Sequence, residues 1–433
     1  MRSSAGWRLA SSSSGRAASV AAGVVLVVAL CVSVFAYPQR KPKKAKLPAP
    51  QLLDRGIAWK RDAATGELAA IHKNLPPATE TNQSSADALP SIRVVAKMVA
   101  ITCAVSTRDG TAVPGLTRAD FRIFDNGVEQ PISYFDGAVQ PASVALIIDA
   151  SPSVLRDTDA MKRAASALVD ALAPLDQAAV IDFSAHTYLQ LPFSDVRELI
   201  RRAVDRVDVR QLLNDTGGSN IYEAVYLAAH DLFPGRKGRK AIVLLTDGQD
   251  SGLGLTLDPR SESPHPGIAS DRLTFEDVVQ SLVENDIQVF AASTENRPKV
   301  MTAAWLAAHA DSTLVTPSAR DLAIPPYTLY LAELVRRSGG QLFFLRETPT
   351  MADTFREIAR EIRAEYTLGF YPAVPSSPPA AALASADRSP ATSPTITTGA
   401  PGAPGWHELR VELPGQSGTR ITYRTSYFVP FAN

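Results

Sequence analysis

The sequence predicts an α/β protein with a doubly wound, mostly parallel sheet, helices on both faces, and a small antiparallel β module. Short continuous apolar runs recur at 144–148, 178–181, 241–245, 287–292 and 342–345. Such runs are typical of strands that are covered on both faces. Segments with helical spacing lie between them, and segments with strictly alternating apolar residues flank the whole region, which is typical of half-buried strands.

The first 37 residues have the layout of an export signal. Arg2, Arg8 and Arg16 precede an apolar run at 17–37, and a basic, proline-rich stretch follows at 40–50. The run is as long as a long signal-peptide core or a short membrane-spanning helix. We therefore expect residues 1–37 to be a signal peptide or an N-terminal membrane anchor. Either one predicts an extracytoplasmic protein that is secreted, periplasmic or anchored by residues 17–37.

The next segments predict a linker and the first part of the β module. Residues 38–90 are rich in proline, lysine, alanine and polar residues without sustained periodicity, so we expect a disordered linker there. Within 91–138, apolar residues alternate and are followed by turn signals such as Asn126-Gly127. The alternating residues are Val99, Ile101, Cys103 and Val105. This segment therefore predicts short antiparallel strands.

Residues 140–365 predict the α/β domain itself. Between the apolar runs, helical spacing is seen before Pro174, before Pro234 and at 351–364. The first of these patterns comprises Met161, Ala165, Leu168 and Leu172, and the second comprises Ile221, Val225, Ala228 and Leu232. The alternation of strand and helix is what predicts a parallel sheet with helices on both faces.

The C-terminal residues 366–433 predict strands that complete the β module. Apolar residues again occupy alternate positions, namely Leu409, Val411 and Leu413, then Ile421, Tyr423 and Tyr427. Residues 372–404 consist almost entirely of alanine, proline, serine and threonine, which favours a disordered insert between two strands. Neither set of strands makes a convincing sheet alone, so we expect them to pair with those of 91–138.

Charge and cysteine content argue against several classes of function. Lys plus Arg and Asp plus Glu both number 44, so no net positive field is available to gather nucleic acid. The two cysteines, Cys31 and Cys103, cannot build a zinc site from thiolates, and Cys31 lies inside the apolar N-terminal run. We therefore expect no nucleic-acid partner and no structural zinc.

Polar side chains gather where three predicted loops meet. Asp149, Ser151 and Ser153 follow the first strand of the α/β domain, Ser219 precedes a helix, and Asp247 follows a later strand. Ligand sites in open α/β sheets form at the carboxyl ends of the strands. If the two strands are neighbours, these five residues come together and present only oxygen atoms.

An all-oxygen set predicts a site for a hard divalent cation. Mg²⁺ is the ion we expect at Asp149, Ser151, Ser153, Ser219 and Asp247, with Mn²⁺ or Ca²⁺ as alternatives. Two carboxylates and three hydroxyls are too few to enclose the ion. We therefore expect one coordination position to be left for water or for a carboxylate of a protein ligand.

These residues resemble the metal-ion-dependent adhesion site (MIDAS) of the von Willebrand factor type A family. The family pattern Asp-x-Ser-x-Ser, then Thr, then Asp is similar to Asp149, Ser151, Ser153, Ser219 and Asp247, with serine at 219 in place of the usual threonine. Residues 115–127 are similar to a β module that precedes the domain in a bacterial subgroup. The resemblance covers roughly residue 91 to the end, and implies metal-dependent adhesion or protein binding.

Three functions remain open from the sequence. The first is a non-enzymatic, metal-dependent adhesion or interaction role. The second is a metal-independent scaffold in the cell envelope. The third is a metal-dependent hydrolase, but Ser151 stands where an aspartyl-phosphate phosphatase would need its second aspartate, and no histidine or lysine is placed as a base. We expect no catalytic residues.

Overall fold

In this computed structural model, all the described helices and strands lie within the unit Leu47–Asn433. The structure describes residues 46–54, 57–62, 68–72, 98–107, 111–138, 140–208, 218–253, 272–302, 324–346, 351–363, 365–372, 405–416 and 418–429. The predicted export segment 1–37, most of the predicted linker and all but Pro372 of the predicted insert lie outside these residues. Within them, no helix is both long and apolar enough to span a bilayer.

The main sheet is mostly parallel, as predicted. Strands β9, β8, β11, β12 and β13 pair in parallel in that order, and β10 and β1 extend the β9 side antiparallel. Their bounds in spatial order are β1 Gln51–Leu52, β10 Thr187–Ser194, β9 Gln177–Phe183, β8 Ala142–Asp149, β11 Arg239–Thr246, β12 Gln288–Ser293 and β13 Leu342–Phe344. β8 therefore lies at the centre of the sheet.

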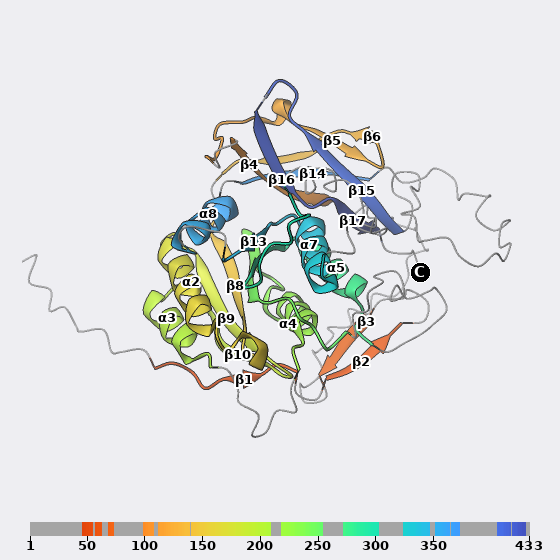
Figure 1. The fold of residues 1–433 in the computed structure, drawn as a ribbon. Coiled ribbons are helices and arrows are strands. Elements are labelled where there is room, and N and C mark those ends of the chain that lie inside the picture. The colour runs from red at the N-terminus through yellow and green to blue at the C-terminus, as the bar shows by residue number, and fades with distance from the viewer. Residues whose placement is uncertain are drawn as a thin grey trace, which may run out of the picture. The chain divides into compact units, whose positions relative to one another are not determined.

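Helices cover both faces of this sheet (Figure 1), and alternate residues of β8 belong to two different apolar cores. Val144, Leu146 and Ile148 join one apolar core, with α2 Thr158–Ala171, α3 Arg197–Arg206 and α8 Met351–Arg363. Ala145 and Ile147 join the other, with α4 Ile221–Leu227, α5 Phe275–Glu284 and α7 Pro326–Ser338. The predicted fold class is confirmed.

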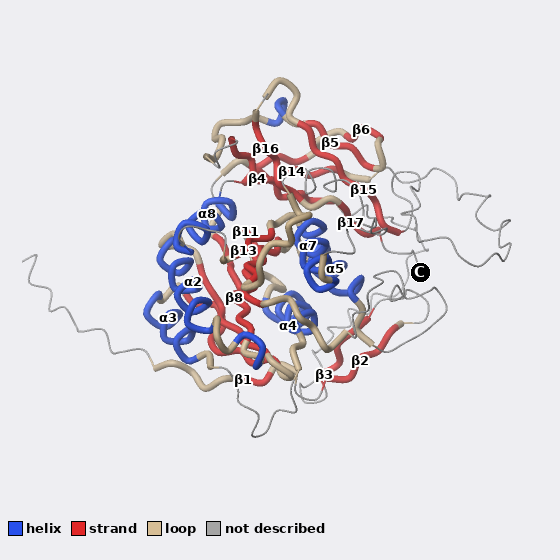
Figure 2. The backbone as a smooth tube through the Cα atoms, viewed as in Figure 1, coloured by secondary structure: helices blue, strands red, loops and turns tan. Residues whose placement is uncertain are grey.

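Two four-stranded antiparallel sheets form a separate layer (Figure 2). One has the order β16, β4, β14, β7, and the other has the order β17, β15, β5, β6. In chain order these are β4 Val99–Thr107, β5 Arg122–Asp125, β6 Val128–Gln130, β7 Tyr134–Asp136, β14 Glu365–Phe370, β15 Gly405–Glu412, β16 Thr419–Tyr423 and β17 Ser426–Val429. The C-terminal strands β14 and β16 flank β4, and β15 pairs with β5.

The prediction of a disordered linker at 38–90 is wrong for its described part. β1 adds to the edge of the main sheet, and β2 Ile57–Arg61 pairs with β3 Leu68–His72. Trp59 packs edge-on against Tyr226 of α4 with ring centroids 5.3 Å apart, and the Tyr226 hydroxyl donates to the Leu68 carbonyl at 2.9 Å. Arg61 donates to both carboxylate oxygens of Asp277, at 2.8 and 2.7 Å. These partners lie far along the chain, so local periodicity did not predict them.

Candidate metal centre

Asp149 is the last residue of β8 and is fully buried. Its Oδ1 accepts a hydrogen bond from the Ser151 backbone N–H at 2.8 Å, and its Oδ2 accepts one from the Thr246 hydroxyl at 2.6 Å. The second bond exists because β8 and β11 are parallel neighbours with Ile148 opposite Leu245. The register of two central strands therefore fixes the orientation of this carboxylate.

The environment of Asp149 disfavours an uncompensated negative charge. Burial is the main reason that its pKa is raised from 3.8 to about 7, and the charge of nearby Asp247 acts in the same direction. The hydrogen bonds from Ser151 and Thr246 oppose that rise. Since a cation favours the charged form of a carboxylate, a positive ion here would relieve the cost of ionising Asp149.

The two serines after Asp149 lie on a tight turn with their hydroxyls together. The Ser151 and Ser153 Oγ atoms are 3.0 Å apart, with Ser151 buried and Ser153 exposed. The 3-10 turn Pro152–Val154 begins with Pro152, whose fixed φ suits a first helical position. Ser151 has the extended backbone (ψ 158°) that a following proline favours. Pro152 thus fits the local geometry that presents both hydroxyls.

Ser219 lies in the loop that leads into α4. Its backbone N–H donates to the Ser251 Oγ at 2.8 Å, and its carbonyl accepts from the Ser251 N–H at 2.8 Å. Asn220 N–H donates to the Ser184 carbonyl at 2.9 Å, just beyond β9, which holds the loop at the carboxyl edge of the sheet. The Ser219 hydroxyl is buried and has no hydrogen-bond partner among the described residues. An orphaned buried hydroxyl is the observation that fits an oxygen ligand of an ion.

Asp247 follows β11 directly and is 3% exposed. Its Oδ1 accepts from the Gln249 N–H at 2.9 Å, and the charge of its carboxylate acts on Asp149. Within the described ranges, no three or more His, Cys, Asp or Glu side chains are grouped to hold a metal. Among the described residues, an ion at this edge would therefore need the serine hydroxyls as well as the two carboxylates, and such a set of oxygen ligands suits a hard cation.

Three residues outside the predicted set organise this edge. Thr246 donates to Asp149 and accepts from the Gly248 N–H at 3.0 Å, while Ser251 holds both backbone groups of Ser219. Asp250 accepts from the backbone N–H groups of Ile221 and Leu253 at 2.8 Å each. The sequence signal that could have identified Thr246 is a hydroxyl side chain directly before Asp247. The roles of Asp250 and Ser251 depend on a loop 30 residues earlier.

Comparisons with known proteins agree with this architecture. Residues 144–249 match the model of the von Willebrand factor type A domain, so the chain contains such a domain. No curated protein matches the chain.

Three solved structures that are similar to part of this chain share little sequence with it. An aerotolerance-related membrane protein of Bacteroides fragilis is 18% identical, with 51% of this chain and 98% of that chain covered and a TM-score of 0.35. BatB of Bacteroides thetaiotaomicron is 19% identical, covering 51% and 97%, with a TM-score of 0.35. Proximal thread matrix protein 1 of the mussel byssus, with a zinc-occupied MIDAS motif, is 16% identical, covering 53% and 47%, with a TM-score of 0.33.

Von Willebrand factor type A domains are typically protein-interaction modules, and many hold a divalent cation at a MIDAS. The described geometry places Asp149, Ser151, Ser153 and Asp247 at one sheet edge, with Ser219 in the loop tied to the end of β9. Among the described residues, the edge thus offers two buried carboxylates, the exposed hydroxyl of Ser153 beside the buried one of Ser151, and the Ser219 hydroxyl, which has no hydrogen-bond partner.

Proposed function

We propose that this chain binds a protein partner through a divalent cation, Mg²⁺ in the first place, held by Asp149, Ser151, Ser153, Ser219 and Asp247. The observation that carries the proposal is the buried Ser219 hydroxyl, which has no hydrogen-bond partner within the described part of the chain. Burying a hydroxyl without a hydrogen bond costs about 1–3 kcal/mol, and an ion ligated by that oxygen would offset the cost. Mn²⁺ and Ca²⁺ offer related oxygen chemistry and are the alternatives.

The ion would act as a charged contact for an acidic ligand. The two carboxylates and three hydroxyls of this set leave room in a coordination shell of six or more for an outside oxygen. Exposed Ser153 lies on the solvent side of the buried Asp149, so the open position would face an approaching partner. An aspartate or glutamate side chain of the partner is the ligand that this charge favours.

The role we propose is non-enzymatic adhesion or interaction outside the cytoplasm. The location rests on the basic and apolar pattern of residues 1–37, which predicts export or anchoring. The von Willebrand factor type A domain at 144–249 supports the interaction role.

Calorimetric titration of Mg²⁺, Mn²⁺ and Ca²⁺ into the full chain tests the metal site. The parent should take up one ion with saturation and gain about 2.7 kcal/mol of stability at a hundredfold excess over Kd. Asp149→Ala should do neither. Asp170→Ala, an exposed carboxylate on α2 that pairs with Arg201, is the matched control and should behave as the parent. Equal uptake by the parent and Asp149→Ala would overturn the proposal.

Partner capture with and without EDTA separates adhesion from the two alternatives. Metal-dependent capture that Asp149→Ala abolishes supports the adhesion role. Capture that EDTA and Asp149→Ala leave unchanged identifies the metal-independent scaffold. Turnover of a phosphoester substrate that requires Asp149 identifies the hydrolase.

A further inference from the structure

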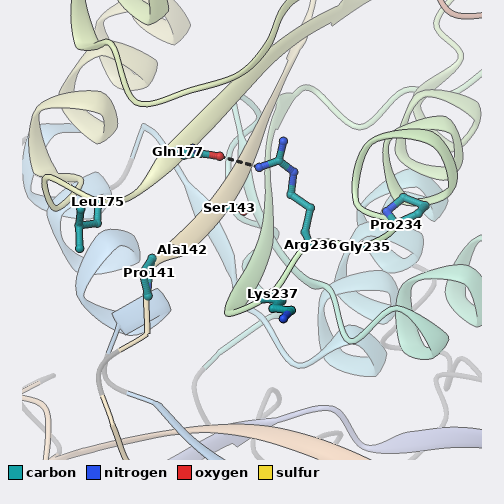
Figure 3. A pocket seen from close by; sticks show the side chains of 9 residues that line it. All are labelled: Pro141, Ala142, Ser143, Leu175, Gln177, Pro234, Gly235, Arg236 and Lys237. Atoms are coloured by element: carbon teal, nitrogen blue, oxygen red, sulfur yellow. Dashed lines mark hydrogen bonds between the residues drawn. The ribbon is translucent and has the colours of Figure 1, made fainter.

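A cavity of about 450 Å³ lies at the opposite edge of the main sheet from Asp149, where the strands begin (Figure 3). Its walls come from the start of β8, the turn before β9 and the turn before β11. The lining residues are Pro141, Ala142, Ser143, Leu175, Gln177, Pro234, Gly235, Arg236 and Lys237. This volume is within the roughly 300–1,000 Å³ that is usual for ligand pockets.

Arg236 is held in one orientation inside this cavity. Its Nη1 donates to the Gln177 Oε1 at 2.6 Å (Figure 3). Its guanidinium lies 3.9 Å from the centre of the Phe193 ring. Burial lowers the pKa of Arg236, and no neighbouring charge contributes to that change. The remaining guanidinium donors are therefore positioned before a ligand arrives, which reduces the ordering cost of binding.

Two positive charges at the cavity lack acidic partners. Within the described ranges, neither Arg236 nor exposed Lys237 forms an ion pair with a carboxylate. Asp176, which lies in sequence between the lining residues Leu175 and Gln177, is buried, and its two carboxylate oxygens accept from the backbone N–H groups of Ala142 and Ala173 at 2.8 and 2.7 Å. The cavity thus presents uncompensated positive charge.

The turn that carries both cations is fixed to the sheet. Gly235 and Gly238 have φ values of +75° and +79°, which glycine adopts without strain. Arg239 N–H donates to the Pro141 carbonyl at 3.1 Å, and a Cβ on Gly238 would lie 2.4 Å from that oxygen. The charges are therefore presented by a rigid turn.

Apolar surface accompanies the charge. Leu175 is 74% exposed, and Pro141 and Pro234 are exposed beside it. A guanidinium forms paired hydrogen bonds with a carboxylate, and apolar walls favour an aliphatic neighbour of that carboxylate. From this combination we propose that the cavity binds an acidic peptide segment of a protein partner, with a carboxylate on Arg236 and Lys237 and an apolar side chain against Leu175. This site does not depend on the metal proposed above.

The test uses the full chain in EDTA, so that a metal cannot capture the probe. The probe is a fluorescent, N-acetylated Leu-Glu-Leu-Glu peptide, and the control probe is Leu-Gln-Leu-Gln. We expect saturable binding of the acidic peptide only, weakened at least fivefold in both Arg236→Gln and Lys237→Gln. Lys237 is exposed, so its variant tests the charge without disturbing packing. Arg201→Gln, which removes an exposed cation already paired with Asp170, should bind as the parent.

Other results of this test overturn the proposal. Equal binding of the two peptides would show that the carboxylates are not recognised. Unchanged binding in both cavity variants would place the peptide elsewhere. Succinate binding that requires Arg236, without peptide binding, would identify a free small acid as the ligand. Absence of binding by any probe would leave the cavity without this role.

Discussion

The two edges of the main sheet carry opposite chemistry on the same strands. β8 begins at the cavity with Ala142 and ends at the candidate metal centre with Asp149, roughly 23 Å away at about 3.3 Å per residue. The end edge gathers buried carboxylates and hydroxyls, and the beginning edge gathers Arg236 and Lys237. All eight residues of β8 are buried between them.

The difference shows how a parallel sheet can separate two polar sites. Because helices cover both faces of the sheet with apolar side chains, the polar residues of β8 and β11 lie only near the ends of these strands. Parallel strands all begin at one edge of the sheet and all end at the other, so each edge collects its own set of loops. The two proposed sites should therefore respond independently to mutation.

The largest effect should follow from Asp149→Ala, which should change the candidate metal centre and leave the cavity at the other edge unaffected. We expect at least a hundredfold loss of Mg²⁺ affinity, because a central carboxylate of the oxygen set is removed. Binding of the acidic peptide in EDTA should stay within twofold of the parent. Lys237→Gln should give the reverse pattern. The dissociation constants of Mg²⁺ and of the acidic peptide are both measured by titration. A variant that weakens binding at both sites would show that the two edges are coupled.

The basic edge can be disrupted through its backbone with Gly238→Ala. We expect a loss of about 3 kcal/mol of unfolding free energy, since the new Cβ would lie 2.4 Å from the Pro141 carbonyl at a φ of +79°. Gly235→Ala is the matched control, with a φ of +75° and no atom within 4 Å of the added Cβ. It should lose only about 1–2 kcal/mol. Urea unfolding measures both, and equal losses would contradict the clash.

Glu361 on α8 should make the stability of the protein depend on pH, and this dependence is a reference for variants at either edge. Burial raises the pKa of its carboxyl from 4.5 to about 7, while nearby Arg420 lowers it. Between pH 4.5 and about 7, the folded state therefore keeps a proton that the unfolded chain loses. The resulting contribution to the free energy of unfolding is complete below pH 4.5 and is lost as the pH rises through about 7. Glu361→Gln should be more stable than the parent by about 2 kcal/mol at pH 8 and equal to it at pH 4. Parallel stability curves across this range would refute the prediction.

The smallest effect, and the most specific one, should come from Ser219→Ala. Without metal, the variant should gain about 1 kcal/mol of stability, because the buried hydroxyl without a partner is removed. The same substitution should weaken Mg²⁺ binding about tenfold, although it stabilises the metal-free protein. Ser153→Ala, which removes an exposed hydroxyl, should lower affinity without stabilising the metal-free protein. A Ser219→Ala protein less stable than the parent in EDTA would contradict the assignment.

The centre of the fold could be predicted because its strands need no neighbours to be recognised. β8 and β11 are continuous apolar runs, and the helices between strands have regular spacing. β10 has neither pattern. Its burial follows from antiparallel pairing with β9, and its Pro192 occupies an exposed position. β2 and β3 depend on Trp59 meeting Tyr226 and on Arg61 meeting Asp277, contacts that link distant parts of the chain.

The candidate site could be predicted as far as its residues lie at strand ends. Asp149, Ser151 and Ser153 share one short segment, and Asp247 follows a second strand. The bond from Thr246 to Asp149 depends on strand register, which composition does not reveal. The cavity at the other edge was also hidden, because its basic turn has the sequence of an ordinary solvated loop.

The position of β4 has a consequence for the order in which the chain is made. β4 is synthesised near residue 100, but its two strand partners, β14 and β16, begin at residues 365 and 419. Its nine residues, Val99–Thr107, carry no charge and include the fully buried Ile101, Cys103 and Val105. An apolar strand with both edges open is prone to wrong pairing. The sheet that contains β4 can therefore be completed only near the end of synthesis, and until then both edges of this strand are open to wrong pairing.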